Sequence, residues 1–221
     1  IWRTVKSTKP LRATGHGGKA APTKLAAETE KDREVLLKRF REIEATLKGA
    51  ARKQCTFVSI DVVGSTKMKI GERASAIAAT FQAYEELVRK HFDSHGVWKQ
   101  TWTPDGVMAC FLDTDLAVAA AQLILADLPE FNEEHKLMRD AFHVRAGLNV
   151  GEVSIFEDSQ LEKVADHSID VAGHMQKYAG EDQLWLSEEV LATLTNRDGF
   201  TPAEKDVDGH AAYSWSPPTS S

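Results

Sequence analysis

The segment 55–66 has the sequence CTFVSIDVVGST, an apolar run that carries one carboxylate and ends in a glycine and two hydroxyl residues. From Thr56 to Val63 it is rich in β-branched and aromatic residues, which predicts a buried strand. The following Gly64-Ser65-Thr66 predicts a turn into a helix. Burying a carboxylate without a partner costs several kcal/mol, so we expect Asp61 near the end of the strand, facing a cation or hydrogen-bond donors.

Two interpretations of Asp61 fit this segment. Backbone N–H groups at a helix start suit phosphate, so a carboxylate for a metal beside such donors outlines a metal–nucleotide site. In the other interpretation, Asp61 is a buried residue that caps its own turn by accepting from the N–H groups of Ser65 and Thr66. The segment alone leaves both open.

A second strand-like segment, 98–111, has the sequence WKQTWTPDGVMACF. Its Pro-Asp-Gly core predicts a tight hairpin between two apolar runs, with Asp105 at the tip. If the two segments are neighbours in one sheet, Asp61 and Asp105 can share divalent cations. A salt link from either aspartate to a neighbouring basic side chain would overturn the enzymatic interpretation and leave only the architecture.

Four motifs follow one another in the chain. They are FxxxDxxGST at 57–66, DGVxAxF at 105–111, RAGLNVGEV at 145–153 and IDVAGHMQ at 169–176. In this order, from about Cys55 to Tyr213, the chain resembles the catalytic domain of class III adenylate and guanylate cyclases. The third motif looks like that family's "RxGxxxGEV" strand and turn, and the fourth looks like its "VNxAxRxx" helix.

The resemblance implies a nucleotidyl cyclase, a phosphorus–oxygen lyase that converts a nucleoside triphosphate to a 3′,5′-cyclic nucleotide and pyrophosphate with two divalent ions. The metal ligands it implies are Asp61, Asp105 and the Val62 carbonyl. Hard oxygen ligands favour Mg²⁺ or Mn²⁺ over zinc. The implied donors to the β- and γ-phosphates are the N–H groups of Val63, Gly64, Ser65 and Thr66. A homodimer with composite sites is implied as well.

The chain departs from the family pattern where the substrate's base and phosphates are bound. The family's adenine-reading Lys and Asp correspond to Thr101 and Lys163, and its helix Asn and Arg correspond to Asp170 and His174. A late Lys of the family falls at Asp208. Losing one charge-stabilising donor typically slows such a reaction substantially.

Nearby residues can take over these roles. Asp170 can accept from a ribose hydroxyl, and a protonated His174 can act as a weaker Arg. Lys163 and Lys177 can bring positive charge to the same face. In the alternative interpretation, His174 caps or packs, and both lysines are solvated helix-face charges.

Three hypotheses result. The first is an active cyclase that does not use ATP, the default substrate of the family, but a pyrimidine triphosphate such as CTP or UTP, because relatives make cyclic pyrimidine nucleotides in antiviral defence against phage. The second is a catalytically silent cyclase-homology dimer that serves as a nucleotide-binding or signalling module. The third is an ordinary adenylate cyclase with shifted contacts. We favour a cyclase because two carboxylates in an apolar strand pair are costly to keep without a cation.

Composition fits one domain with an appendage, since the chain has 221 residues, of which 42% are hydrophobic and 27% are charged. A net charge of -6 argues against nucleic acid as a partner. The two cysteines, Cys55 and Cys110, lie in apolar runs and are expected to be reduced core residues of a cytosolic protein. No window approaches the apolar length that spans a bilayer, so a membrane contact is expected only through a region before Ile1.

The predicted organisation has four parts. Residues 1–27 form a flexible basic arm, 28–50 a signalling or dimer helix, 51–216 the cyclase-homology domain and 217–221 a tail. The helix carries Leu36, Phe40, Ile43 and Leu47 at coiled-coil spacing. It either packs on its own domain or forms a parallel dimer that feeds into the strand with Asp61.

Strands and helices alternate along the domain as β-α-β-β-α-β, which predicts an α+β fold with a ferredoxin-like core and additions. Helices are expected over 72–91, 117–128, 164–178 and 188–194, the last with Ser187 as N-cap. The first of these has Ile77, Phe81, Tyr84, Leu87 and Val88 on a core-facing side. Further strands are expected over 97–102, 107–111, 142–149, 153–156 and 183–187, with a hairpin-like end over 207–215.

Overall fold

The computed structural model describes residues 24–218 except 50–51, 155–159, 162–163 and 165. The chain divides into two compact units, residues 1–49 and 50–221, and each is described by itself. Most of the predicted basic arm lies outside the described residues, and so does Lys163. No helix in the described part of the chain is long and apolar enough to cross a membrane.

The first unit contains one long helix, α1 (Lys24–Gly49). Its apolar side chains are exposed, with Leu36 at 66%, Phe40 at 65% and Ile43 at 59%. An exposed apolar stripe on a lone helix is what a coiled-coil partner would cover. The predicted role of this helix in dimer formation stays a prediction.

The second unit is built on a seven-stranded sheet with the order β2-β3-β1-β4-β5-β7-β6. The strands are β1 (Lys53–Val62), β2 (Lys99–Trp102), β3 (Gly106–Phe111), β4 (Val144–Val153), β5 (Gln183–Ser187), β6 (Thr201–Pro202) and β7 (Ala212–Trp215). Only the β4–β5 pair is parallel among these strands. The antiparallel order β2-β3-β1-β4 is the ferredoxin-like core, which confirms the predicted fold class.

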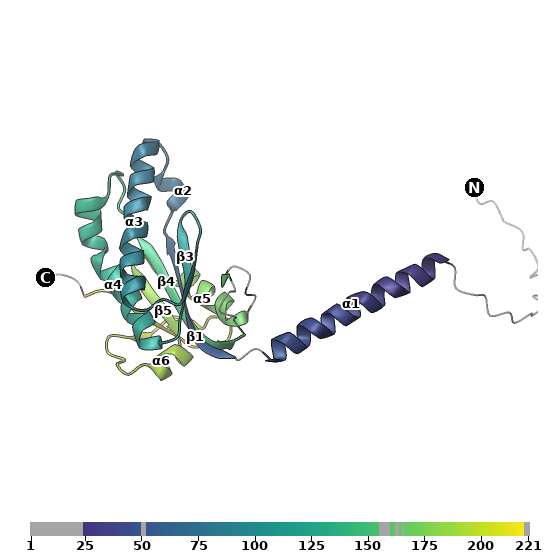
Figure 1. Ribbon diagram of the computed structural model, residues 1–221. Coiled ribbons are helices and arrows are strands. Elements are labelled where there is room, and N and C mark those ends of the chain that lie inside the picture. The colour runs from purple at the N-terminus through teal and green to yellow at the C-terminus, as the bar shows by residue number, and fades with distance from the viewer. Residues whose placement is uncertain (1–23, 50–51, 155–159, 162–163, 165, 219–221) are drawn as a thin grey trace, which may run out of the picture. The chain divides into compact units, whose positions relative to one another are not determined.

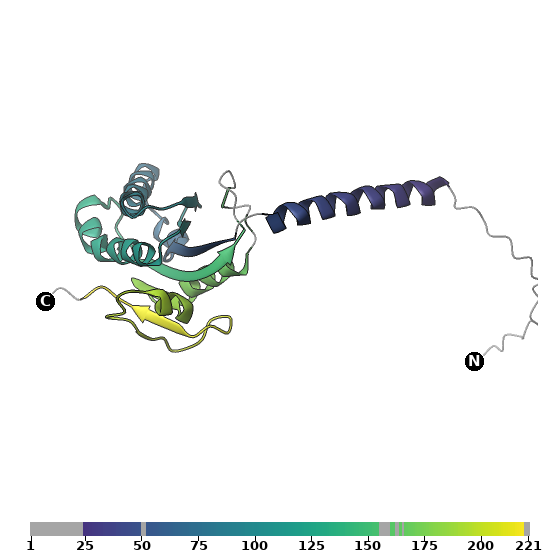
Figure 2. The ribbon, with the colours of Figure 1, turned by 60° about the horizontal axis from the view of Figure 1, so that its bottom comes forward.

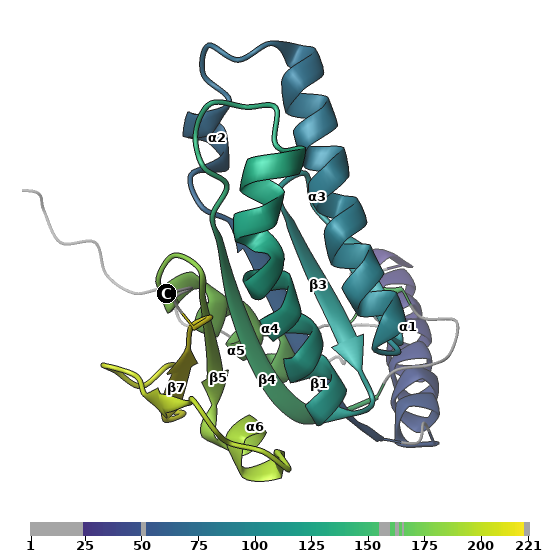
Figure 3. The same cartoon turned by 90° about the vertical axis from the view of Figure 1, so that its left-hand side faces the viewer.

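Helices cover both faces of this sheet (Figures 1 and 2). The helices are α2 (Ser65–Met68), α3 (Ala74–Ser94), α4 (Thr114–Glu130), α5 (His167–Tyr178) and α6 (Glu188–Thr193), and α4 runs into a π-helical segment η1 (Phe131–His135). In Figure 3, α3 and α4 lie across the strands β1, β3 and β4. The side chains of α5 pack on the opposite face.

The alternation of β1 builds both halves of the core. Val58, Ile60 and Val62 join the large apolar cluster with α3 and α4. Cys55 and Phe57 join a second cluster with Cys110 and residues of α5. Both cysteines are buried free thiols, as predicted. By the same alternation, Asp61 lies near the end of β1 on the face of Cys55 and Phe57, which is the face that α5 covers.

Strand β4 corrects the sequence analysis, which expected two strands separated by a turn after Asn149. β4 runs without a break from Val144 to Val153. Its glycines serve close packing on α5: a Cβ at Gly147 would lie 2.0 Å from the Gln176 nitrogen, and one at Gly151 would lie 2.0 Å from Ser168 Oγ. The glycine-rich motif is the contact surface of a helix, and the turn prediction was wrong.

Other boundaries agree more closely. The helix predicted over 164–178 begins at His167, because Asp166 caps it by accepting from the Ser168 N–H at 2.9 Å. Ser187 caps α6 as predicted, accepting from the Val190 N–H. The hairpin-like end is a tight turn, bridged between Val207 and His210, before strand β7.

Candidate active site

Strands β1 and β3 bring the two predicted aspartates to one edge of the sheet. Asp61 lies opposite Gly106 in the register, and the Val62 N–H donates to the Asp105 carbonyl at 2.9 Å. A Cβ on Gly106 would lie 3.3 Å from Asp61 Oδ1. Asp105 is also close enough for its charge to raise the pKa of Asp61. We call this pair, with its neighbours Ser65 and Arg145, the acidic edge.

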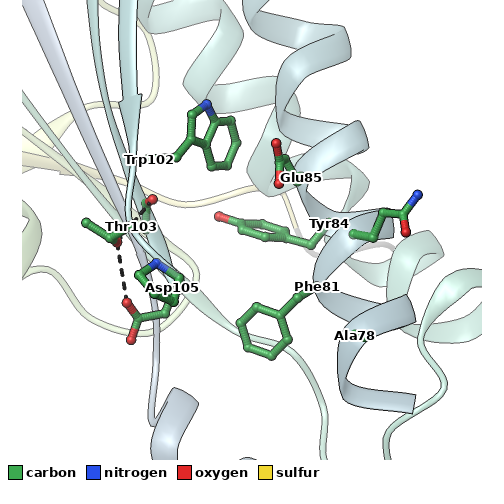
Figure 4. Close-up of a pocket in the computed structure, with 10 residues that line it drawn as sticks. Ala78, Phe81, Tyr84, Glu85, Trp102, Thr103 and Asp105 are labelled. Atoms are coloured by element: carbon green, nitrogen blue, oxygen red, sulfur yellow. Dashed lines mark hydrogen bonds between the residues drawn. The ribbon is translucent and has the colours of Figure 1, made fainter. Parts of the chain in front are cut away.

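Asp105 is held by hydroxyl groups on both of its oxygens. Ser65 Oγ donates to Oδ2 at 2.6 Å, and Thr103 Oγ1 donates to Oδ1 at 3.4 Å (Figure 4). Ser65 belongs to the turn after β1, whereas Thr103 precedes the hairpin tip. The carboxylate is thus fixed between the two segments that the sequence analysis singled out.

Asp61 is held by an arginine that the sequence analysis quoted only as part of a motif. Arg145 Nη2 lies 3.2 Å from Asp61 Oδ2, and Arg145 Nη1 donates to the Lys177 carbonyl at 3.2 Å. Burial raises the pKa of Asp61, the hydrogen bond from Arg145 lowers it, and the charge of Asp105 raises it, with a net increase. Asp61 and Arg145 are cross-strand partners in β1 and β4, so the strand alternation around Arg145 was the available signal.

This ion pair is the kind of salt link that argues against Asp61 as a metal ligand. Its geometry limits the objection, since Arg145 contacts Oδ2 only, and Oδ1 lies on the side of Gly106. The side chain of Asp61 is 34% exposed, so it is not sealed from the solvent.

One of the four N–H groups predicted to donate to phosphate in the turn after β1 is not available. The Val63 N–H donates to the His143 carbonyl at 2.9 Å, so it is already used by the backbone and is not a free phosphate donor. Gly64 adopts a left-handed conformation with φ 63° and is the N-cap of α2. Asp61 makes no capping hydrogen bond there, so the self-capping interpretation is wrong. Among the described residues, no acceptor takes the N–H groups of Gly64, Ser65 or Thr66.

Asp170, His174 and Lys177 share one exposed face of α5, which we call the α5 face. His174 Nδ1 lies 2.5 Å from Asp208 Oδ2, and Asp208 has a positive φ of 51°. The two positions at which the chain departs from the family's Arg and late Lys are therefore in contact with each other. A carboxylate offsets the positive charge that His174 can carry.

The other predicted site residues do not lie at the acidic edge. Thr101 is half-buried on β2, paired with Met108. Within the described part of the chain, no hydrogen bond or ion pair joins Asp170 or His174 to Asp61 or Asp105.

A different acidic group lies at the end of α4. Ligand atoms of Glu130, Glu134 and His135 lie within 4.8 Å of one another, and all three residues are exposed. Exposed acidic groups of this kind are common without a bound ion, and this group shares no residue with the acidic edge.

No protein-family model matches the sequence, and a search of curated proteins finds no match. Solved structures do match. The guanylate cyclase domain of RhGC from Catenaria anguillulae in complex with GTP has a TM-score of 0.65 at 16% identity, covering 77% of this chain and 100% of that chain. The adenylyl cyclase CyaB from P. aeruginosa has a TM-score of 0.65 at 15% identity, covering 75% and 94%. The guanylyl cyclase Cya2 has a TM-score of 0.63 at 18% identity, covering 75% and 92%.

The second unit therefore has the fold of a class III nucleotidyl cyclase catalytic domain, as the resemblance in sequence implied. The similar structures include cyclases named for adenylate and for guanylate chemistry, so the likeness concerns the architecture and leaves the base open.

Proposed function

We propose that this chain is a nucleotidyl cyclase that converts a nucleoside triphosphate to a 3′,5′-cyclic nucleotide and pyrophosphate. The observation that carries the proposal is the meeting of Asp61, near the end of β1, with Asp105, directly before β3. The charge of Asp105 raises the pKa of the partly buried Asp61, and a cation between the two carboxylates would offset this cost.

The donor set fits Mg²⁺ or Mn²⁺. Asp61, Asp105 and the Val62 carbonyl offer only oxygen atoms, which these ions prefer. When bound, a pair of such ions lowers the pKa of the ribose 3′-hydroxyl and neutralises the departing pyrophosphate. Ser65 keeps the Asp105 carboxylate in place, and Arg145 orients Asp61 through one oxygen.

The reaction forms one bond and breaks another. The ribose 3′-oxygen attacks the α-phosphorus, the bond from the α-phosphorus to the bridging oxygen of the β-phosphate breaks, and the hydroxyl proton leaves to solvent. The N–H groups of Gly64, Ser65 and Thr66 are suited to donate to the phosphates of the leaving group.

The second half of the proposed site comes from the α5 face of a partner copy in a homodimer. There Asp170 accepts from a ribose hydroxyl, and His174, held at Nδ1 by Asp208, donates from Nε2 to phosphate. Lys177 adds positive charge. Because Thr101 and Lys163 replace the family's adenine readers, a pyrimidine triphosphate is proposed beside ATP as the substrate.

The test uses the full chain with each of ATP, GTP, CTP and UTP and with Mn²⁺, and cyclic product is measured by mass spectrometry. We expect product from one base, and none from Asp61→Asn. Asp93→Asn, the same change at an exposed position near the end of α3, is the matched control and keeps the activity. Equal activity of Asp61→Asn and the control would overturn the proposal.

A second candidate function is supported by the two ion pairs. Arg145 neutralises Asp61, and Asp208 neutralises His174, as expected of a cyclase-homology module that no longer turns over substrate. Such a module gives no product with any of the four triphosphates. Calorimetric titration with the triphosphates then distinguishes a nucleotide-binding module, which binds at least one, from a purely structural dimer, which binds none.

A further inference from the structure

A pocket of about 280 Å³ lies between α3 and the β2–β3 hairpin, beside Asp105 (Figure 4). Three aromatic side chains form part of its walls, and the other walls are formed by polar and small residues. The principal lining residues are Phe81, Tyr84, Glu85, Trp102, Thr103 and Asp105. The proposed cyclase chemistry uses only Asp105 among these residues, so the rest of the pocket has no assigned role.

The hydroxyl of Tyr84 has no partner in the described structure, although the residue is only 2% exposed. Nearly all buried polar groups are hydrogen-bonded, and leaving one unpaired costs stability. Figure 4 shows this hydroxyl directed toward the hairpin, between Trp102 and Thr103. Burial raises the pKa of Tyr84, and the charge of Asp61 raises it further, so the group stays a protonated donor. A ligand acceptor in the pocket would satisfy it.

Besides Tyr84, the polar lining residues are Gln82, Glu85, Thr103 and Asp105, of which Glu85 and Asp105 are carboxylates. Glu85 lies at the rim, and both of its contacts with Arg89, at 2.7 and 2.8 Å, use the same oxygen, Oε1. The Arg89 guanidinium lies 4.6 Å from the centre of the Trp102 ring, which fixes the aromatic wall. With Asp105 on the opposite side, two carboxylates favour a ligand that presents N–H donors.

We propose that this pocket binds an amino-substituted nitrogen heterocycle of one or two rings, such as the base of adenosine or cytidine. A flat ring suits walls made by Phe81 and Trp102, since stacked and edge contacts between rings are favourable. The ring nitrogen or carbonyl accepts from Tyr84, and the amino group donates to Glu85 or Asp105. The volume of about 280 Å³ lies just below the usual range for ligand pockets, which is roughly 300–1,000 Å³, so the pocket suits a small ligand.

The experiment measures binding of free nucleosides to the full chain by isothermal titration calorimetry in buffer with EDTA. Adenosine and cytidine carry the amino group, and inosine and uridine lack it. We expect saturable binding of at least one amino nucleoside and weaker binding of its partner without the amino group. Because no metal, phosphate or turnover is involved, this result does not depend on the cyclase proposal.

Two variants make the test specific. Tyr84→Phe removes only the hydroxyl and is expected to weaken nucleoside binding about tenfold. Tyr178→Phe, the same change at a tyrosine that is 43% exposed on α5, is expected to leave binding unchanged. Thermal unfolding of both variants checks that they fold. Absence of binding to any nucleoside, equal binding with and without the amino group, or equal effects of the two substitutions would overturn the proposal.

The heterocycle has two sources, which a second titration distinguishes. The protein is first saturated with Mn²⁺ and a non-hydrolysable triphosphate of the same base. If the pocket holds the base of the triphosphate bound at Asp105, the free nucleoside no longer binds. If the pocket holds a separate nucleoside, binding persists and still depends on Tyr84. Persistent binding that is insensitive to Tyr84→Phe would again contradict the assignment.

Discussion

The acidic edge and the α5 face hold their charged groups in different ways. At the acidic edge, Asp61 lies on β1 and Asp105 lies in the hairpin turn directly before the paired strand β3, and Arg145 and Ser65 fix their carboxylates. On the α5 face, the side chain of His174 is 48% exposed, and within the described ranges its partner is Asp208. A strand ladder fixes the spacing of its side chains, whereas an exposed helix face can change residues without disturbing the core. The acidic edge, which matches the family's motifs, is thus the half of the proposed site whose geometry is determined by the sheet.

The same substitution in both regions tests directly whether the acidic edge contributes more to activity than the α5 face. Asp105→Asn is expected to lower kcat/KM for cyclic product by about 1,000-fold, because it removes a charge that the proposed mechanism assigns to cation binding. Asp170→Asn keeps a ribose acceptor and is expected to cost less than about tenfold. The measurement is steady-state kinetics at saturating Mn²⁺. If the two substitutions had equal effects, the acidic edge would not be the dominant half.

The position of the α5 face depends on a glycine in β4. Gly147→Ala would place a Cβ 2.0 Å from the Gln176 nitrogen and 2.4 Å from the Ala172 carbonyl oxygen, both backbone atoms of α5. We expect a loss of about 3 kcal/mol of unfolding free energy, because helix and strand must separate. Urea unfolding measures this loss.

Gly173→Ala on α5 is the matched control, since nothing lies within 4 Å of its added Cβ. In a helix interior this change is expected to stabilise the protein by up to about 1 kcal/mol. Similar losses in both variants would mean that close packing at Gly147 is not what holds α5 on the sheet.

Some features of the fold could be predicted from the sequence alone, and others could not. The buried run of β1, the Pro-Asp-Gly hairpin and the Ser187 cap could be predicted, because local composition and turn chemistry determine them. The continuous strand β4 could not. Gly147 and Gly151 are common in turns, and only the approach of α5, whose first residue lies at His167, explains them as packing glycines.

The candidate site was predictable to the same degree. The closeness of Asp61 and Asp105 follows from two neighbouring strands, and the sequence predicted it. The use of the Val63 N–H by His143, the ion pair of Arg145 and the contact of His174 with Asp208 all join segments far apart in the chain. Such contacts depend on register and loop paths, and a local pattern such as the strand alternation around Arg145 gives only the face of the strand and not the partner.

A smaller effect is expected when the α5 face is given back its positive charge. The double substitution His174→Arg and Asp208→Asn removes a carboxylate and adds a permanent cation beside the phosphates. We expect kcat to rise about tenfold, because one charge-stabilising donor is restored. The rate is measured with the preferred triphosphate.

His174→Arg alone is the control for this double substitution, because Asp208 remains to bind the new guanidinium. It should gain less than the double variant. A rate that falls in the double variant would show that the imidazole itself is needed, and the α5 face would then be as specialised as the acidic edge.

The smallest effect concerns a link outside the sheet, between the segment after α2 and the segment before β4. Glu72 Oε1 accepts from the Arg139 N–H and from Arg139 Nε, both at 2.9 Å, and these contacts hold the pKa of Glu72 below its usual value. A lowered carboxyl pKa stabilises the fold above the usual value of about 4.3, and this stability is lost as the pH falls through the lower value of the folded state.

Glu72→Gln should therefore lower Tm at pH 7 and match the native protein in acid, whereas the exposed Glu204→Gln should not change Tm at either pH. The link lies beside α2 and not in the strand ladder. If Glu72→Gln lowers stability but leaves activity unchanged, the acidic edge is maintained by strand pairing and does not need this link.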